Sequence, residues 1–267
     1  MSGLTVATYN VHKCVGLDMR RDPARIARVI AEIAPDVIAL QEADRRFGDR
    51  AGLLDLPALR DEAGLEAVPL GRSGPSHGWH GNVVLTRNMT IEDVRPLRLP
   101  GLEPRGAMMI DMGRGPLRLR VVAAHLGLLR ASRLVQTRVL LAALAEARAL
   151  RDDRPAVLMG DLNEWRLRHN SSLHLLAAQK RAPANLVRSF PAHMPVLALD
   201  RIMVSPDAEL RDFRAHDSAL ARQASDHLPV TARLLLPGAG AGDAAVPPSQ
   251  PFDDPAARAP RRAGGQG

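Results

Sequence analysis

The stretch DPARIARVIAEIAPDVIALQE, Asp22–Glu42, is the part of the sequence that decides the fold. Asp22 and Pro23 are typical of a helix start, an N-cap followed by a first helical residue. Isoleucine and valine then recur at the spacing of one helix face. Pro35 ends the helix, and Val37–Leu40 follows as a short, fully apolar strand. A helix that leads directly into a buried strand indicates an α/β fold.

On both sides of this unit the sequence predicts further strands and one long amphipathic helix at Arg130–Leu150. The strands are expected at Leu4–Tyr9, Asn82–Leu85, Ala107–Asp111, Leu117–Ala124, Ala156–Met159, Arg201–Val204 and Leu228–Leu236. Residues 1–236 therefore form one predicted α/β domain. Residues 237–267 are rich in Pro, Gly and Ala and are predicted to be a disordered tail.

Composition restricts the classes of protein that the chain can represent. No apolar run approaches the roughly 18 residues of a membrane helix, and the N-terminus lacks the pattern of a secretion signal. One cysteine, Cys14, permits neither an internal disulfide nor a thiolate zinc site. We therefore expect a reducing, cytoplasmic compartment and no integral membrane segment. We also expect a monomer.

The net charge of +7 predicts attraction to phosphorylated substrates, nucleic acid or anionic lipid. A solvated basic surface without a specific partner explains the same charge equally well. Aromatic residues make up only 3% of the chain, which disfavours a surface that stacks single-stranded bases.

Polar residues stand at the ends of most predicted strands. They are Asn10, Gln41, Glu42, His125, Asp161, Asn163, Asp200, Ser225, Asp226 and His227. Each one alone is typical of a turn or a cap. Together, the carboxylates and amides offer hard oxygen ligands for Mg²⁺ or Mn²⁺, and the histidines offer hydrogen bonds to phosphoryl oxygens. The set suits metal-assisted attack of water on phosphorus. The sequence contains no GxxxxGK[ST], HExxH or GxSxG motif. Their absence disfavours a P-loop for nucleotide triphosphates, a zinc peptidase site and a nucleophile elbow.

These residues lie in seven motifs, whose order and spacing resemble the endonuclease/exonuclease/phosphatase superfamily. The motifs are TYNVHKCVG (Thr8–Gly16), DVIALQEAD (Asp36–Asp44), GNVVLTR (Gly81–Arg87), AAHLG (Ala123–Gly127), GDLNEW (Gly160–Trp165), LDRIMVS (Leu199–Ser205) and SDHLPV (Ser225–Val230). The residues of the first motif, and the segment RSFPAHMP ahead of LDRI, resemble those of a bacterial subgroup of uncharacterised metal-dependent hydrolases. The resemblance implies a four-layer α/β/β/α sandwich of two packed mixed sheets, with the active site at one end.

The resemblance also implies a role for each matching position. Glu42 resembles the principal magnesium ligand, with Asn10 beside the metal and Asp226 on the same or a second metal. Asp161 resembles the residue that orients or deprotonates the attacking water. The implied phosphate contacts are Asn163, His125 and His227, and Asp200 is the implied carboxylate partner of His227.

Four further positions have two readings each. Arg105 resembles an arginine near the site of relatives, or forms a surface salt bridge. His12 reaches the phosphate or caps a turn. His77 and His80 lie on a Gly-containing loop, where they contact substrate or are simply solvated, and we expect neither to be catalytic.

The leading prediction is a divalent-metal-dependent phosphodiesterase or phosphatase that acts on a non-nucleic phosphoester, with a lipid headgroup among the candidates. The alternative is a DNA or RNA nuclease, which the basic folded part favours. A catalytically silent phosphate- or nucleic-acid-binding protein is the remaining class, although a binder has no need of both Asp161 and Glu42.

Overall fold

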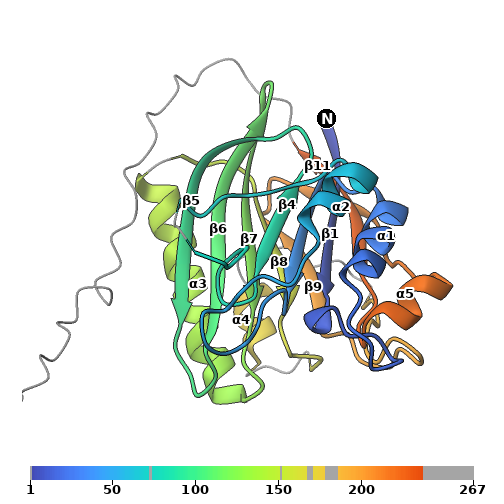
Figure 1. Ribbon diagram of the computed structural model, residues 1–267. Helices are drawn as coiled ribbons and strands as arrows, with labels where there is room; N and C mark the ends of the chain where they lie inside the picture. Colours follow the sequence, from blue (N-terminus) through green and yellow to red (C-terminus); the bar gives the residue numbers. More distant parts are fainter. Residues whose placement is uncertain (1, 72–73, 151, 167–170, 178–185, 237–267) are drawn as a thin grey trace, which may run out of the picture.

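The computed structural model describes residues 2–71, 74–150, 152–166, 171–177 and 186–236. Two β-sheets pack face to face, and helices cover the outer face of each sheet (Figure 1). The predicted four-layer α/β/β/α sandwich is therefore confirmed. The predicted tail, 237–267, lies outside the described residues.

The first sheet has six strands in the order β10-β11-β1-β2-β4-β3. Their bounds are β1 Ser2–Asn10, β2 Val37–Gln41, β3 Glu66–Ala67, β4 Val83–Thr86, β10 Glu209–Ala215 and β11 Val230–Leu236. Strands β1 and β2 are parallel, and β11 runs antiparallel to β1. The sheet is thus mixed.

The second sheet has five strands in the order β5-β6-β7-β8-β9. Their bounds are β5 Thr90–Leu99, β6 Arg105–Arg114, β7 Leu117–His125, β8 Ala156–Asp161 and β9 Asp200–Val204. Only β7 and β8 are parallel, with His125 level with Asp161. The antiparallel β9 sets Asp200 opposite Asp161 in turn.

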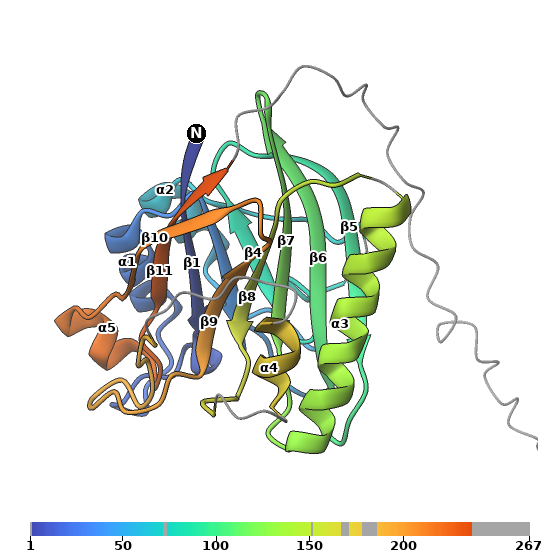
Figure 2. The same ribbon diagram turned by 180° about the vertical axis from the view of Figure 1, so that it is seen from behind.

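The helices divide between the two outer faces. The first sheet is covered by α1 Pro23–Ile33, α2 Leu56–Ala63 and α5 Ala219–Ala224. The second is covered by α3 Arg130–Leu150 and α4 Ser172–Ala177, which Figure 2 shows from behind. A short 3₁₀ turn, His12–Cys14, follows β1. None of the described helices is both long and apolar enough to cross a membrane.

The core between the sheets is built by strands that are buried on both faces. In β2, Val37 and Ala39 join the core between the two sheets, whereas Ile38 and Leu40 pack against the helices. This explains why the strand is apolar at four successive positions and not at alternate ones. The predicted helix starts as expected, because the Asp22 carboxylate accepts a hydrogen bond from the Arg25 amide at 2.9 Å.

Candidate functional site

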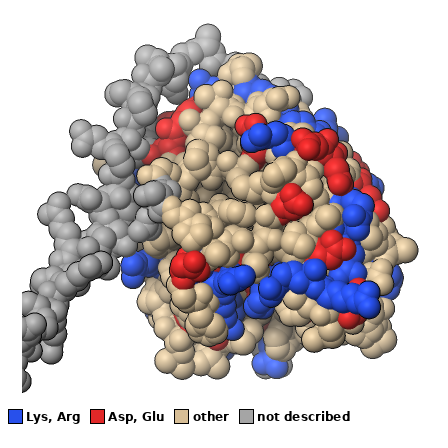
Figure 3. Space-filling model, in the orientation of Figure 1, with Lys and Arg blue, Asp and Glu red and all other residues tan. Residues whose placement is uncertain are grey.

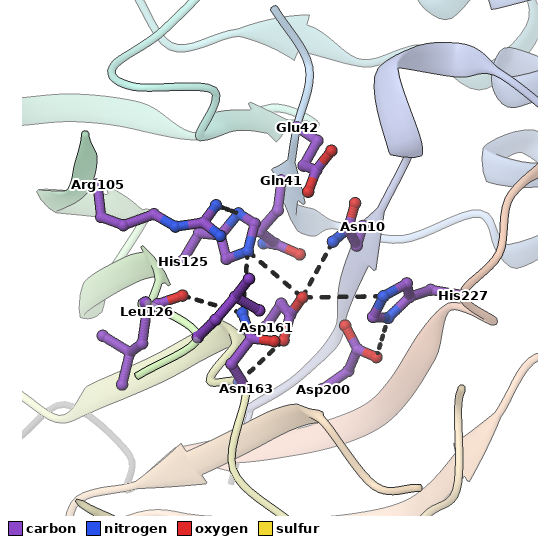
Figure 4. Close-up of polar contacts among 12 residues, drawn as sticks. Asn10, Gln41, Glu42, Arg105, His125, Leu126, Asp161, Asn163, Asp200 and His227 are labelled. Atoms are coloured by element: carbon purple, nitrogen blue, oxygen red, sulfur yellow. Dashed lines mark hydrogen bonds and ion pairs between the residues drawn. The ribbon is translucent and has the colours of Figure 1, made fainter. Parts of the chain in front are cut away.

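The strand alternation that fills the core also aims polar side chains into the seam between the sheets. Side chains two residues apart in a strand lie on the same face. A core-facing residue two or four positions away accompanies each of the four site residues at a strand end: Val6 for Asn10, Ala123 for His125, Met159 for Asp161 and Ile202 for Asp200. The site is therefore the polar end of the core, and Figure 4 shows its residues converging from both sheets.

Asp161, at the end of β8, is the centre of the cluster and is only 2% exposed. Its Oδ2 accepts a hydrogen bond from Asn10 Nδ2 at 3.0 Å, and its Oδ1 accepts one from the Asn163 amide at 2.9 Å. The Nε2 atoms of His125 and His227 lie 3.5 and 3.8 Å from Oδ2. Burial raises the pKa of the Asp161 carboxyl to about 6.

Gly160 allows Asp161 to reach this position. Its φ is +155°, and a Cβ on Gly160 would lie 1.8 Å from the carbonyl oxygen of Ala124 on the neighbouring strand. Only glycine permits so close an approach of β7 and β8. The GD pair of the sequence is therefore a backbone requirement as well as a source of a carboxylate.

His227 is held by a carboxylate. Its Nδ1 lies 2.8 Å from Asp200 Oδ2, which also accepts a hydrogen bond from the Ser189 hydroxyl. Burial opposes protonation of the imidazole, but the adjacent Asp200 carboxylate outweighs it and raises the pKa of His227 to about 10. His227 is thus a buried imidazolium, with Nε2 directed toward Asp161 (Figure 4).

His125 is held by a cation instead. Arg105 Nη1 lies 2.9 Å from His125 Nδ1. Because a guanidinium has only donors, Nδ1 accepts this hydrogen bond and the single ring proton is on Nε2. Burial and the Arg105 charge hold the pKa of His125 well below its ordinary value. The side-chain Nδ2 of Asn163, itself a donor, lies 3.2 Å from His125 Nε2 and gives its hydrogen bond to the Leu126 carbonyl at 2.9 Å.

Glu42 follows β2 with a φ of +55°, an uncommon conformation for a residue other than glycine. Its carboxylate forms an ion pair with Lys13, which lies in the turn after β1. Burial raises the pKa of Glu42, but the neighbouring cationic groups, Lys13 and Arg105 among them, outweigh this effect and lower it to about 2. The Glu42 carboxylate is therefore ionised at neutral pH, as a ligand of a hard cation must be.

Asn10, His12 and Asp226 form the other side of the site. Asn10 Oδ1 accepts the His12 backbone amide at 3.1 Å, and His12 Nδ1 lies 3.8 Å from an Asp226 carboxylate oxygen. His12 Nδ1 is also 3.1 Å from the Val15 carbonyl. These contacts fit the turn reading of His12, and they also place the residue beside two of the predicted metal ligands.

The structure brings together all the residues to which the sequence assigned a catalytic role, but not both loop histidines. His80 lines a small pocket with Glu42, Arg105 and His125. Its Nδ1 lies 3.2 Å from the Pro104 carbonyl oxygen. His77 lines a neighbouring cavity and not that pocket. The sequence reasoning overlooked Lys13 and Ser189. Both lie inside quoted motifs, and Lys13 is one of only two lysines in the chain, which was an available signal.

Among the residues that the structure describes, one group of ligand atoms is spaced closely enough to hold a metal ion. Single ligand atoms of Asp161, Asp200 and His227 all lie within 4.8 Å of one another. Asp200 Oδ1 is buried and has no hydrogen-bond partner among the described residues. However, the His227–Asp200 distance is that of a hydrogen bond, and a protonated imidazole has no lone pair for a metal. The oriented histidine therefore accounts for this cluster better than an ion does.

Comparison with known proteins identifies the class that this fold and site define. The model of the Endonuclease/Exonuclease/phosphatase family matches residues 7–227. The chain therefore belongs to this family, and the site lies within the matched residues.

Individual relatives agree with that assignment. The uncharacterized protein YbhP of Escherichia coli is 36% identical over 169 residues, which are 60% of this chain and 64% of YbhP. The match thus spans less than two thirds of that relative. A family protein from Beutenbergia cavernae has a TM-score of 0.66 at 23% identity, covering 91% of this chain and 74% of its own. A mannosyl-6-phosphatase from Bacteroides thetaiotaomicron has a TM-score of 0.71 at 17% identity, covering 87% and 100%. At these identities the two solved structures show the shared fold alone.

Proposed function

We propose that this chain is a divalent-metal-dependent phosphoester hydrolase that directs water onto phosphorus in line with the leaving group. The observation that carries the proposal is the buried Asp161 carboxylate, met by Asn10 and by two histidines, one neutral and one cationic. Two buried histidines around one buried carboxylate are costly to fold, and such groups concentrate at catalytic sites.

Asp161 is the proposed general base. A carboxyl with a pKa near 6 is a stronger base than an ordinary aspartate and is still ionised at neutral pH. The hydrogen bonds from Asn10 and the Asn163 amide fix its orientation, so that one carboxylate oxygen is aligned with a water molecule before the substrate reacts.

His227 is the proposed electrostatic stabiliser of the phosphoryl oxygens. Asp200 keeps it cationic and fixes its ring, so the Nε2–H group is available to donate to an oxygen on which negative charge develops. His125, with its proton on Nε2, donates a second and weaker hydrogen bond. Asn163 lies between Asp161 and His125 and is the remaining phosphate contact.

Glu42, Asn10 and Asp226 are the proposed metal ligands, with Mg²⁺ or Mn²⁺ as the ion. The residues fit such an ion because Glu42 is ionised and half-buried, while Asn10 Oδ1 is oriented by the His12 amide. When bound, the ion supplies Lewis-acid polarisation of a phosphoryl oxygen. An ion bound at Glu42 would compete with the Lys13 ammonium for the same carboxylate.

The test is hydrolysis of bis-p-nitrophenyl phosphate by the purified protein with and without Mg²⁺. We expect turnover that depends on Mg²⁺ and is abolished by a chelator. Glu42→Gln, which removes the charge of the proposed ligand, raises the Mg²⁺ concentration required for half-maximal rate. Glu66→Gln, on the exposed strand β3, is the matched control and leaves it unchanged. Absence of turnover with Mg²⁺ and with Mn²⁺ contradicts the proposal.

A nuclease is the second candidate, because one observation favours it. The small pocket beside Glu42 is lined by four cationic side chains, Lys13, Arg46, Arg50 and Arg105, and by two carboxylates, Glu42 and Asp44. An excess of positive charge attracts a phosphate backbone. Nicking of plasmid DNA at a rate that falls with Glu42→Gln supports the nuclease, whereas turnover of small phosphoesters alone supports the leading proposal.

A further inference from the structure

A cavity of about 540 Å³ adjoins the candidate site. Its walls come from residues 48–50, from 67–71 and from 74–80. Two of its residues, Arg50 and His80, also line the small pocket that contains Glu42, Arg105 and His125. A molecule with its phosphoryl group at the site can therefore extend past these two side chains into the cavity.

The charge of the cavity differs from that of the pocket beside it. Among its described lining residues, Asp49 and Arg50 are the charged side chains, and their charges cancel. Arg50 is moreover paired in two places with Asp44, through contacts of 2.8 and 3.2 Å. The cavity is therefore suited to a neutral group and not to a further phosphate of a nucleic acid backbone. Figure 3 shows a broad uncharged area on this face, with basic side chains gathered along its lower edge.

Part of the wall is apolar and includes an aromatic side chain. Val68, Leu70 and Trp79 line the cavity, together with two prolines. His77 adds an imidazole whose Nδ1 is buried without a hydrogen-bond partner among the described residues. Burial lowers the pKa of His77, so the ring is neutral at pH 7. Such a lining recognises an apolar or aromatic group that offers one hydrogen-bonding atom.

The segment that carries His77 and Trp79 is held in place by packing and by hydrogen bonds. A Cβ on Gly52 would lie 2.2 Å from the His77 ring, so the ring packs directly on the glycine backbone. Trp79 Nε1 donates to the Leu97 carbonyl at 3.0 Å, and Asn82 Nδ2 donates to the Trp79 carbonyl at 3.1 Å. A wall ordered before binding loses little entropy when a ligand arrives.

We propose that this cavity binds a largely apolar, ring-sized organic group of the phosphoester whose phosphoryl group lies between Asp161 and Glu42. The inference rests on the proposed function for the placement of the phosphoryl group. It assigns the selection of the substrate to Leu70, His77 and Trp79, none of which belongs to the proposed hydrolytic machinery.

Binding of two phosphonates tests the proposal without turnover, because a P–C bond is not hydrolysed. The chain has two tryptophans, so Trp165→Phe leaves Trp79 as the sole reporter in the cavity wall. We expect phenylphosphonate, with Mg²⁺ present, to change the Trp79 emission saturably. Its affinity should exceed that of methylphosphonate about 10-fold, the gain expected from burying a ring. Equal affinity for the two phosphonates overturns the proposal.

Variants of Leu70 locate the difference in the cavity. Leu70→Phe, in the same background, narrows the cavity at this part of its wall and is expected to reduce the preference for phenylphosphonate to less than about 3-fold. Leu70→Ala enlarges the space and retains binding of the ring. Leu150→Phe, the same substitution at an exposed residue on α3, is the matched control and leaves the preference unchanged. A preference that survives Leu70→Phe contradicts the assignment to this cavity.

The outcomes separate this inference from the proposed function. Metal-dependent hydrolysis without a preference for the phenyl group leaves the function standing and removes the cavity assignment. A Leu70-dependent preference for the phenyl group in a protein that hydrolyses no phosphoester supports the cavity and removes the function.

Discussion

Two histidines, His125 and His227, flank the same carboxylate and differ in charge. They are almost equally buried, at 2% and 5% exposure, so desolvation does not separate them. Arg105 holds the first as a neutral imidazole, whereas Asp200 holds the second as an imidazolium. Burial disfavours the charged form of both rings; the Arg105 charge adds to this effect at His125, whereas the Asp200 carboxylate outweighs it at His227.

The carboxylate that the two histidines share carries the largest expected effect. Asp161→Asn keeps the shape and removes the proposed base, so we expect the rate of bis-p-nitrophenyl phosphate hydrolysis to fall on the order of 10²–10⁴-fold. Asp153→Asn, an identical change at an exposed residue paired with Arg148, is the control. An Asp161→Asn protein with full metal-dependent activity excludes Asp161 as the base.

Removal of the carboxylate next to His227 should make this histidine neutral, like His125. Asp200→Asn is expected to lower the pKa of His227 below its ordinary value, because burial is then opposed by less negative charge. The rate should fall about 10- to 100-fold, as is usual when the partner that orients a functional histidine is lost. NMR titration of His227 without Mg²⁺ measures the pKa. A His227 that stays cationic at pH 8 in Asp200→Asn contradicts this account.

Removal of the cation next to His125 should change the pKa of this histidine. Arg105→Gln takes a positive charge and a hydrogen-bond donor from Nδ1, so the pKa of His125 should rise while burial still keeps it below its ordinary value. We expect about a 10-fold loss of rate. Arg148→Gln, at an exposed guanidinium, is the matched control. If the pKa of His125 is the same in Arg105→Gln as in the unaltered protein, Arg105 does not set it.

Ser189 makes the smallest contribution to the difference between the surroundings of His125 and His227. Its hydroxyl donates to the same Asp200 oxygen that contacts His227. Ser189→Ala removes this buried hydrogen bond and should lower the free energy of unfolding by about 1 kcal/mol in a denaturant titration. His227 stays cationic, because Asp200 keeps its charge. Loss of the His227 charge in Ser189→Ala would instead assign to Ser189 a direct electrostatic role.

Most of the central elements could be predicted from the sequence because they are apolar. The helix Arg130–Leu150 is observed with the predicted bounds, and the predicted strand Val37–Leu40 extends by one residue to Gln41. The sequence did not reveal β5 or β10. Both are edge strands, with largely exposed or half-buried polar side chains, and β5 contains Pro96. An edge strand needs neither an apolar face on both sides nor every backbone donor.

The sequence could predict which residues form the candidate site, but not their protonation states or ion pairs. The motifs place Asp161, His125 and His227 together, and strand alternation points the first two into the seam. Nothing in the sequence shows that Arg105 contacts His125, because the two residues come together only when β6 and β7 pair. The neutral state of His125 is thus a product of tertiary structure, as is the ion pair between Lys13 and Glu42.

The central claim is that Asp161 directs a water molecule onto phosphorus, and hydrolysis in ¹⁸O-labelled water tests it most directly. With Mg²⁺ and bis-p-nitrophenyl phosphate, we predict that the label enters the phosphorus-containing product. The rate of incorporation should fall at least about 100-fold in Asp161→Asn and stay unchanged in Asp153→Asn. Incorporation at the same rate in both variants would contradict the account.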